Sequence, residues 1–187
     1  MAPGERLKLL NDQEVEHRPR LLAITDDTGP VALGGVMGGH ATMVGGDTTD
    51  VFFEAAYFDP SAVQGKARDL ALTSDAAYRF ERGVDPAGTA AALERATALT
   101  IQVCGGKAGP VSFASGELPK REPVAVRPAR VRALLGYEVD DGEIRAILER
   151  LHCGVQAADA RTLRATPPSW RFDLAIEEDF VEEVARV

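Results

Sequence analysis

The sequence contains few of the residues that build disulfide frameworks or histidine- and cysteine-rich metal sites. Its 187 residues include 2 cysteines, Cys104 and Cys153, and 3 histidines. Two thiols cannot form a disulfide framework, and they cannot hold a structural zinc ion without further ligands. This cysteine usage favours a reducing, cytoplasmic compartment.

Long hydrophobic runs are also missing. No stretch of about 18 apolar, uncharged residues occurs, which excludes a transmembrane helix and argues against a membrane partner. Residues 1–6 lack the apolar centre of a secretory signal. With 45% hydrophobic and 27% charged residues, the chain has the composition of a globular protein with one large domain or two small ones.

Basic residues are outnumbered, 21 against 29 acidic residues, which gives a net charge of −8. This balance argues against nucleic-acid binding over the whole surface but leaves a local basic patch open. The charge is uneven: Lys120–Arg132 holds five basic residues and one acidic residue, whereas Asp173–Val187 holds six acidic residues and one basic residue.

Hydrophobic patterning predicts an α+β fold in two parts. In the first part, apolar runs and turn signals predict short strands, and Asp85–Pro86 predicts the start of a helix that ends at Gly105. Cys104 lies on the apolar stripe of that helix and is expected to be buried. A boundary is expected near residues 115–122, where glycine, proline and charge cluster. The predicted strands are 7–10, 20–25, 31–33 and 51–58.

The second part predicts a small arrangement similar to a winged helix. A strand at 124–126 precedes helices at 128–135 and from about 140 to 151. Strands near 155 and at 163–165, then a last helix from about 175, complete the pattern. That last helix has no stop signal, so we expect the chain to end within it.

Two features of the first part could form a binding pocket. The glycine turn Gly34–Gly39 could approach a ligand closely or could simply pack tightly, and it lacks the lysine of a phosphate-binding loop. Glu54 lies among apolar residues, so it is either a pocket-floor acceptor or part of a solvated edge strand. A catalytic triad is not supported, because none of the histidines (His17, His40, His152) lies in a convincing position for a base.

The acidic end could bind a metal or could be a solvated face. Asp179, Glu182 and Glu183 are spaced i, i+3 and i+4, so they share one face of a helix, and Asp173 precedes it. Such carboxylates suit Mg²⁺. The preceding Pro167–Asp173 segment contains the only tryptophan and is interpreted as a structural clip rather than a base-stacking surface.

Four long motifs, in order, resemble the middle of the beta subunit of bacterial phenylalanyl-tRNA synthetase. They are Val31–Gly39, Phe53–Pro60, Ser74–Pro86, and Pro167–Asp173 continuing through Glu177–Val187. The resemblance implies that residues 1–118 are the later part of a combined third and fourth domain that houses an editing site. It implies that residues 119–187 are a fifth, winged-helix-like domain.

The resemblance also implies a function. The parent enzyme attaches phenylalanine to its tRNA with ATP, which binds to the alpha subunit and not to this region, in an alpha2-beta2 tetramer. This region contributes to the subunit interface and to editing, the hydrolysis of tyrosine mischarged onto phenylalanine tRNA. The family's upstream segment, which carries a site histidine, is absent, so we expect the isolated fragment to be inactive.

Individual site residues follow from the matched motifs. Glu54 matches the residue that recognises the tyrosine hydroxyl, and Gly35 and Gly38 match glycines that leave room for the ring. Ser74 stands where the family usually has threonine, and Ala76 matches the pocket alanine. Four carboxylates match magnesium ligands in a site shared with the alpha subunit: Asp173, Asp179, Glu182 and Glu183.

Two alternatives compete with a synthetase fragment. One is a non-enzymatic nucleic-acid module that uses the winged-helix-like part and the basic stretch. The helix from Gly142 to His152 is roughly neutral, with two arginines against two glutamates, which disfavours this module. The other is a free-standing hydrolase, which the missing upstream segment disfavours.

Overall fold

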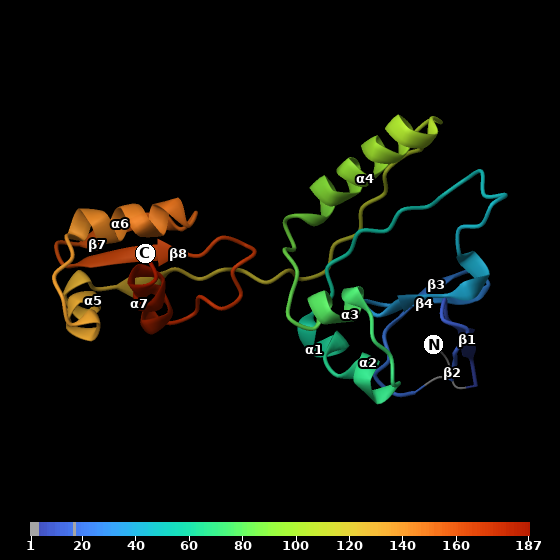
Figure 1. Ribbon diagram of the computed structural model, residues 1–187, viewed down its shortest axis with the longest axis horizontal. Helices are drawn as coiled ribbons and strands as arrows, with labels where there is room; N and C mark the ends of the chain where they lie inside the picture. Colours follow the sequence, from blue (N-terminus) through green and yellow to red (C-terminus); the bar gives the residue numbers. More distant parts are fainter. Residues whose placement is uncertain (1–3, 17) are drawn as a thin grey trace. The chain divides into compact units, whose positions relative to one another are not determined.

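The computed structural model describes residues 4–16 and 18–187, so His17 lies outside the described residues. The chain divides into two compact units, Met1–Ser112 and Phe113–Val187 (Figure 1). Both units combine small antiparallel sheets with helices, as expected for an α+β chain. Within the described residues, no helix has the length and apolarity needed to cross a membrane.

Unit 1 begins with two small sheets. Strands β1 (Arg6–Lys8) and β2 (Glu14–Glu16) form an antiparallel hairpin that places Leu7 opposite Val15 on the buried face. The second sheet has the order β3-β4-β5, from β3 (Ala23–Asp26), β4 (Gly29–Leu33) and β5 (Met37–Gly38). Its first turn closes because Asp26 accepts hydrogen bonds from the backbone amides of Thr28 and Gly29.

Short helices then close the core of unit 1. A 3₁₀ turn, η1 (His40–Thr42), is followed by α1 (Pro60–Val63), α2 (Lys66–Asp69) and α3 (Asp75–Phe80). The side chain of Asp59 caps α1 and that of Ser74 caps α3. The core joins sheet and helix residues that are all buried: Leu9, Leu33, Val36, Val63, Leu70, Leu72 and Ala77.

Helix α4 (Thr89–Cys104) differs from its prediction in two ways. It begins three residues after Pro86, because the Asp85 carboxylate caps a turn by accepting from the Ala87 amide. No residue of α4 is buried, and Cys104 is exposed, so its predicted place in a core is wrong. An apolar stripe shows which face of a helix can be buried, but a second element must cover that face. On α4 even Val103 stays exposed.

The predicted strand at 51–58 is also wrong, because these residues form neither helix nor strand. Phe52 is 88% exposed and Val51 is exposed as well. A strand needs a neighbour that accepts and donates its backbone hydrogen bonds. Among the described residues, none pairs with this segment in a ladder.

Unit 2 follows its prediction closely. Its elements are β6 (Val124–Val126), α5 (Pro128–Leu135), α6 (Asp141–Arg150), β7 (Gly154–Asp159), β8 (Thr162–Thr166) and α7 (Glu177–Ala185). The three strands form an antiparallel sheet of order β6-β8-β7. The largest fully buried side chains at its centre come from a strand and three helices: Val126, Val131, Ile144, Leu148 and Phe180. This core needs only contacts within one short stretch of chain.

Candidate functional site

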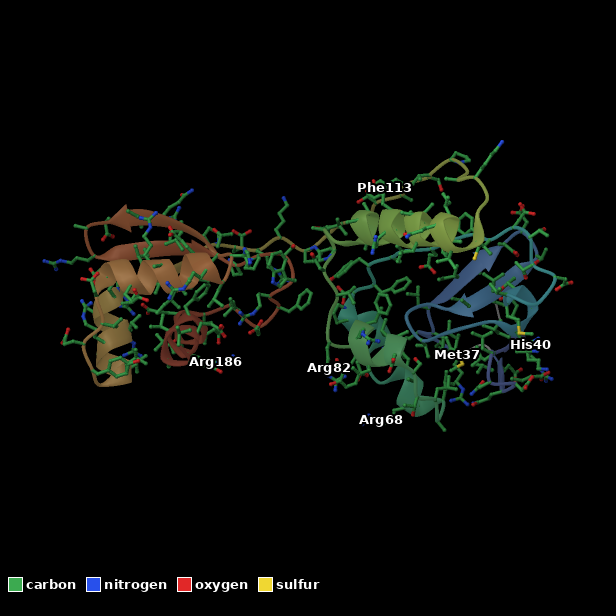
Figure 2. All side chains as sticks on the ribbon, turned by 45° about the horizontal axis from the view of Figure 1, so that its top comes forward. Met37, His40, Arg68, Arg82, Phe113 and Arg186 are labelled. Atoms are coloured by element: carbon green, nitrogen blue, oxygen red, sulfur yellow. The ribbon has the colours of Figure 1, made fainter. Side chains whose placement is uncertain are left out.

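Unit 1 contains a pocket of about 550 Å³, a volume that suits a small organic group. Its wall combines sheet residues and the glycine turn with residues 54–56, Phe58, α3, the turn before α4 and the start of α4. Most of the lining is apolar. Met37, labelled in Figure 2, belongs to the β5 part of this wall.

The glycine turn forms one side of the pocket, and glycine is required there. Gly35 has a φ of +70°, in the left-handed region that side chains disfavour. A Cβ atom at Gly35 would lie 3.0 Å from Val63 Cγ2 and 3.2 Å from Phe58 Cδ2, and one at Gly38 would lie 3.3 Å from Leu10 Cδ1. Both glycines also line the pocket. The turn therefore packs tightly and borders the pocket at once.

Two aromatic rings contribute the apolar surface. The ring centroids of Phe58 and Phe80 are 5.1 Å apart with an interplanar angle of 56°, a tilted pair. Both residues line the pocket, although they come from the irregular segment and from the end of α3. Such a pair gives a ring-shaped ligand an apolar contact surface.

Glu54 lines the pocket, but its side chain is exposed rather than buried. The segment that carries it has no strand partner, so water still reaches the carboxylate. Partial desolvation by neighbouring atoms nevertheless raises the pKa of Glu54 above its usual value. A partly desolvated carboxylate is stabilised by a ligand that donates a hydrogen bond to it.

Ser74 and Ala76 have different places. Ala76 lines the pocket, whereas Ser74 does not. The Ser74 hydroxyl donates to the carbonyl oxygen of Val36 at 2.6 Å and accepts from the Ala77 amide at 3.1 Å. Ser74 therefore fastens the start of α3 to the glycine turn, and it holds Ala76 against the pocket.

Sequence reasoning missed two polar lining residues, Asp85 and Thr89. The Asp85–Pro86 pair predicts a helix start. In the structure the Oδ1 atom of Asp85 accepts a hydrogen bond from the Ala87 amide at 3.0 Å, in the turn before α4. Nothing in the local pattern shows that this turn also borders a pocket whose sheet residues and glycine turn lie 47 to 61 residues earlier.

In unit 2, two of the four predicted magnesium ligands are held by an arginine. Arg171 donates to both carboxylate oxygens of Asp173, at 2.9 and 2.6 Å, and to both oxygens of Glu183, at 3.3 and 2.8 Å. Glu183 is only 7% exposed and also pairs with Arg186 at 3.3 Å. The hydrogen bonds from Arg171 lower the pKa of Asp173, and those carboxylates raise the pKa of Arg171.

The other two carboxylates do not join them. Asp179 accepts from the backbone amides of Ala175 and Ile176, at 2.7 and 2.8 Å, and so caps α7, while Glu182 is exposed. Within residues 4–16 and 18–187, no group of three or more histidine, cysteine or acidic side chains is arranged to hold a metal ion. In this arrangement three of the four predicted ligands are already engaged, Asp173 and Glu183 by Arg171 and Asp179 by the start of α7, so the set does not fit magnesium without rearrangement.

The basic stretch and the acidic end, which differ in charge sign along the sequence, meet in unit 2. Arg127 binds Glu177 in a pair whose closest approach is 2.5 Å, and Arg130 binds Glu178 at 3.2 Å. Arg132 pairs with Asp141 on α6. The charges of the basic stretch are therefore largely engaged within the unit.

The diproline segment behaves as the predicted clip. The Trp170 ring packs edge-on against His152 with centroids 5.7 Å apart, and the Arg121 guanidinium lies 4.7 Å from the Phe172 ring centroid. Arg121 also donates to the carbonyl oxygen of Ser169. These contacts tie the segment to its own unit.

Comparisons with known proteins follow this division of the chain. The family model described as the B3/4 domain matches residues 1–105, and that of the tRNA synthetase B5 domain matches residues 124–187. A protein of Thiobacillus denitrificans named phenylalanine–tRNA ligase beta subunit is 52% identical over 184 residues, which cover 98% of this chain and 23% of the relative. The protein of the same name from Nitrosospira multiformis is 47% identical over 185 residues, or 99% of this chain. The chain thus spans 23% of the length of these relatives.

Proposed function

Because the chain belongs to the B3/4 domain family and corresponds to a segment of the phenylalanine–tRNA ligase beta subunit, we propose that unit 1 takes part in editing. The substrate would be tyrosine esterified to phenylalanine tRNA, and the reaction would be hydrolysis of that ester. One observation carries the proposal: Glu54, Gly35, Gly38 and Ala76, which the sequence motifs single out, all line one pocket.

The pocket supports this choice by its chemistry. An apolar surface that includes Phe58 and Phe80 suits an aromatic ring, and Glu54 offers an acceptor for a phenolic hydroxyl. Phenylalanine lacks that hydroxyl and could not donate this hydrogen bond to Glu54. No histidine, cysteine or lysine is among the described lining residues, and ester hydrolysis needs only a positioned water molecule. Ser74 supports the site by holding α3 to the glycine turn.

Unit 2 is proposed to be the winged-helix-like fifth domain and to contribute to the interface with an alpha subunit in a cytoplasmic alpha2-beta2 enzyme. ATP and phenylalanine would bind to the alpha subunit. The order of its elements, with a β7-β8 hairpin after α5 and α6, supports the winged-helix assignment. Magnesium at Asp173, Asp179, Glu182 and Glu183 stays a prediction, and it would require Arg171 to release two of them.

The alternative of a nucleic-acid module is not favoured. In α6 the two arginines pair with glutamates, Arg145 with Glu149 at 2.8 Å and Arg150 with Glu143 at 3.0 Å. The basic stretch pairs with α7, as described above. Few cations are therefore free to contact phosphates. Titration with duplex DNA at two salt concentrations should show no salt-dependent binding.

The editing proposal is tested in the full-length beta subunit paired with its alpha subunit, by hydrolysis of tyrosyl-tRNA and phenylalanyl-tRNA. A hydrogen bond to a charged acceptor is worth ~1.5–3 kcal/mol, so Glu54→Ala should reduce the preference for tyrosyl-tRNA by about 10- to 100-fold. Glu94→Ala is the matched control, because Glu94 is exposed on α4 and does not line the pocket. Unchanged discrimination in Glu54→Ala would show the pocket assignment to be wrong.

A further inference from the structure

We propose that Asp85 is a second recognition residue of the unit 1 pocket and that it binds the α-ammonium group of the aminoacyl ligand. The inference rests on the proposed editing function and deepens it. Glu54 would identify the side chain of the ligand, and Asp85 would identify its free amine. The ligand class is then an ester or amide of an aromatic amino acid whose amine is not acylated.

The composition of the pocket wall carries the first step. Glu54 and Asp85 are the two charged side chains among the described lining residues, and both are acidic. Apart from Thr89, the other lining residues are apolar or glycine. Two acceptors in an apolar wall suit a ligand with an apolar body and two separate donors. A tyrosyl group has this pattern, with a hydroxyl on the ring and an ammonium on the α-carbon.

The geometry of Asp85 carries the second step. Only its Oδ1 atom is used in the turn before α4, where it accepts from the Ala87 amide at 3.0 Å. The Oδ2 atom lies beside Gly88, which also lines the pocket: a Cβ atom on Gly88 would be 3.2 Å from Oδ2. The turn therefore fixes the carboxylate, and the absence of a side chain at position 88 leaves its second oxygen accessible.

Charge supports the assignment. An α-amino group has a pKa of about 7.7–8.0, so it is largely protonated at neutral pH. A hydrogen bond between an ammonium and a carboxylate is roughly twice as strong as one between neutral groups. Because Asp85 is partly buried and already oriented, little ordering of the side chain is needed when the ligand binds.

The test measures binding of three probes to the 187-residue chain by NMR titration. The probes are L-tyrosinamide, L-phenylalaninamide, which lacks the hydroxyl, and 3-(4-hydroxyphenyl)propanamide, which lacks the amine. Asp85→Asn keeps the Oδ1 acceptor of the turn but removes the charge. It should weaken the binding of L-tyrosinamide about tenfold and leave that of 3-(4-hydroxyphenyl)propanamide unchanged, because the latter has no ammonium group.

Gly88→Ala gives a second, independent variant. Position 88 has a φ of −83°, which alanine adopts without strain, and the added methyl group would crowd Asp85 Oδ2. It should weaken L-tyrosinamide and spare the probe without an amine. If either variant weakens the binding of L-tyrosinamide and of 3-(4-hydroxyphenyl)propanamide equally, Asp85 only maintains the shape of the pocket. The inference is then overturned.

Glu54→Gln separates this inference from the proposed function. It should reduce the preference for L-tyrosinamide over L-phenylalaninamide, while Asp85→Asn should leave that preference intact. If Glu54→Gln leaves the preference for L-tyrosinamide unchanged, the proposed function is refuted and with it the inference. A normal Glu54 effect with no effect of Asp85→Asn would refute the role of Asp85 alone.

Discussion

Replacing Arg171 with methionine should destabilise unit 2 more than any other single loss of charge described here. Arg171 is the shared partner of Asp173 and Glu183, with four hydrogen bonds between 2.6 and 3.3 Å. Its side chain is 20% exposed and that of Glu183 is 9% exposed. Methionine keeps much of the side-chain length but leaves Glu183 charged in a nearly dry position.

The magnitude follows from that burial. Removing one partner of a buried ion pair costs about 3–5 kcal/mol, because an uncompensated charge remains. The remaining bond from Arg186 to Glu183 compensates part of that charge, so the expected cost lies below this range, at about 2–3 kcal/mol. For a unit of roughly 75 residues, each kcal/mol shifts the Tm by about 4–8 °C, so a fall of about 10–20 °C is expected.

The assay can follow unit 2 alone, because the only tryptophan, Trp170, lies in it and packs against His152. Thermal unfolding is recorded by tryptophan fluorescence for the unaltered chain, Arg171→Met and the control Arg130→Met. Arg130 also pairs with α7, through Glu178, but their side chains are 46% and 50% exposed. An exposed pair contributes about 0–1 kcal/mol, so the control should change the Tm by only a few degrees. Equal shifts in the two variants would refute the reasoning.

Further predictions concern the thiols, acid stability and the glycine turn. Cys104 is exposed and Cys153 is buried with a raised pKa, so a thiol reagent should label Cys104 rapidly and Cys153 only on unfolding, which mass spectrometry can verify. Hydrogen bonds from Arg171 and Arg127 lower the pKa values of Asp173 and Glu177 in the folded state. Their stabilisation is therefore complete above the unfolded-state values of about 4 and is lost as the pH falls further, so the Tm of unit 2 from Trp170 fluorescence should decline below about pH 4; a Tm that is flat to pH 3 would contradict this. Gly35→Ala should lower the free energy of unfolding of unit 1 by about 1–3 kcal/mol in urea titrations, whereas Gly46→Ala, which meets open space, should change it little.

The second unit could be predicted element by element, and the first could not. In unit 2 the apolar residues that form the core lie within one stretch of about 60 residues, so local periodicity suffices to identify every helix and strand. In unit 1 the segment 51–58 has a strand composition without a pairing partner, and α4 has an apolar stripe without a cover. Composition describes what a segment can bury, whereas the structure also depends on what lies beside it.

The site shows the same division. Glu54, Gly35, Gly38 and Ala76, which the motifs single out, line one pocket, and the editing role of each residue stays a prediction. They could not show that the Ser74 hydroxyl donates a hydrogen bond to the Val36 carbonyl oxygen instead of lining the pocket, because that contact joins residues 38 positions apart. They also could not show that Arg171 occupies Asp173 and Glu183, since helical spacing places carboxylates on a face but does not reveal what opposes that face.

The bond between Ser74 and Val36 has a mechanical consequence for the pocket. It fastens α3 to the glycine turn, and both pack on the buried core of unit 1. Gly35 and Ala76 therefore lie on the well-packed side of the pocket. Glu54 lies on the segment 51–58, which has no strand partner among the described residues. A ligand that contacts both Glu54 and the glycine turn must also hold this segment in place. Its affinity will therefore include the cost of ordering the segment as well as the contacts it makes.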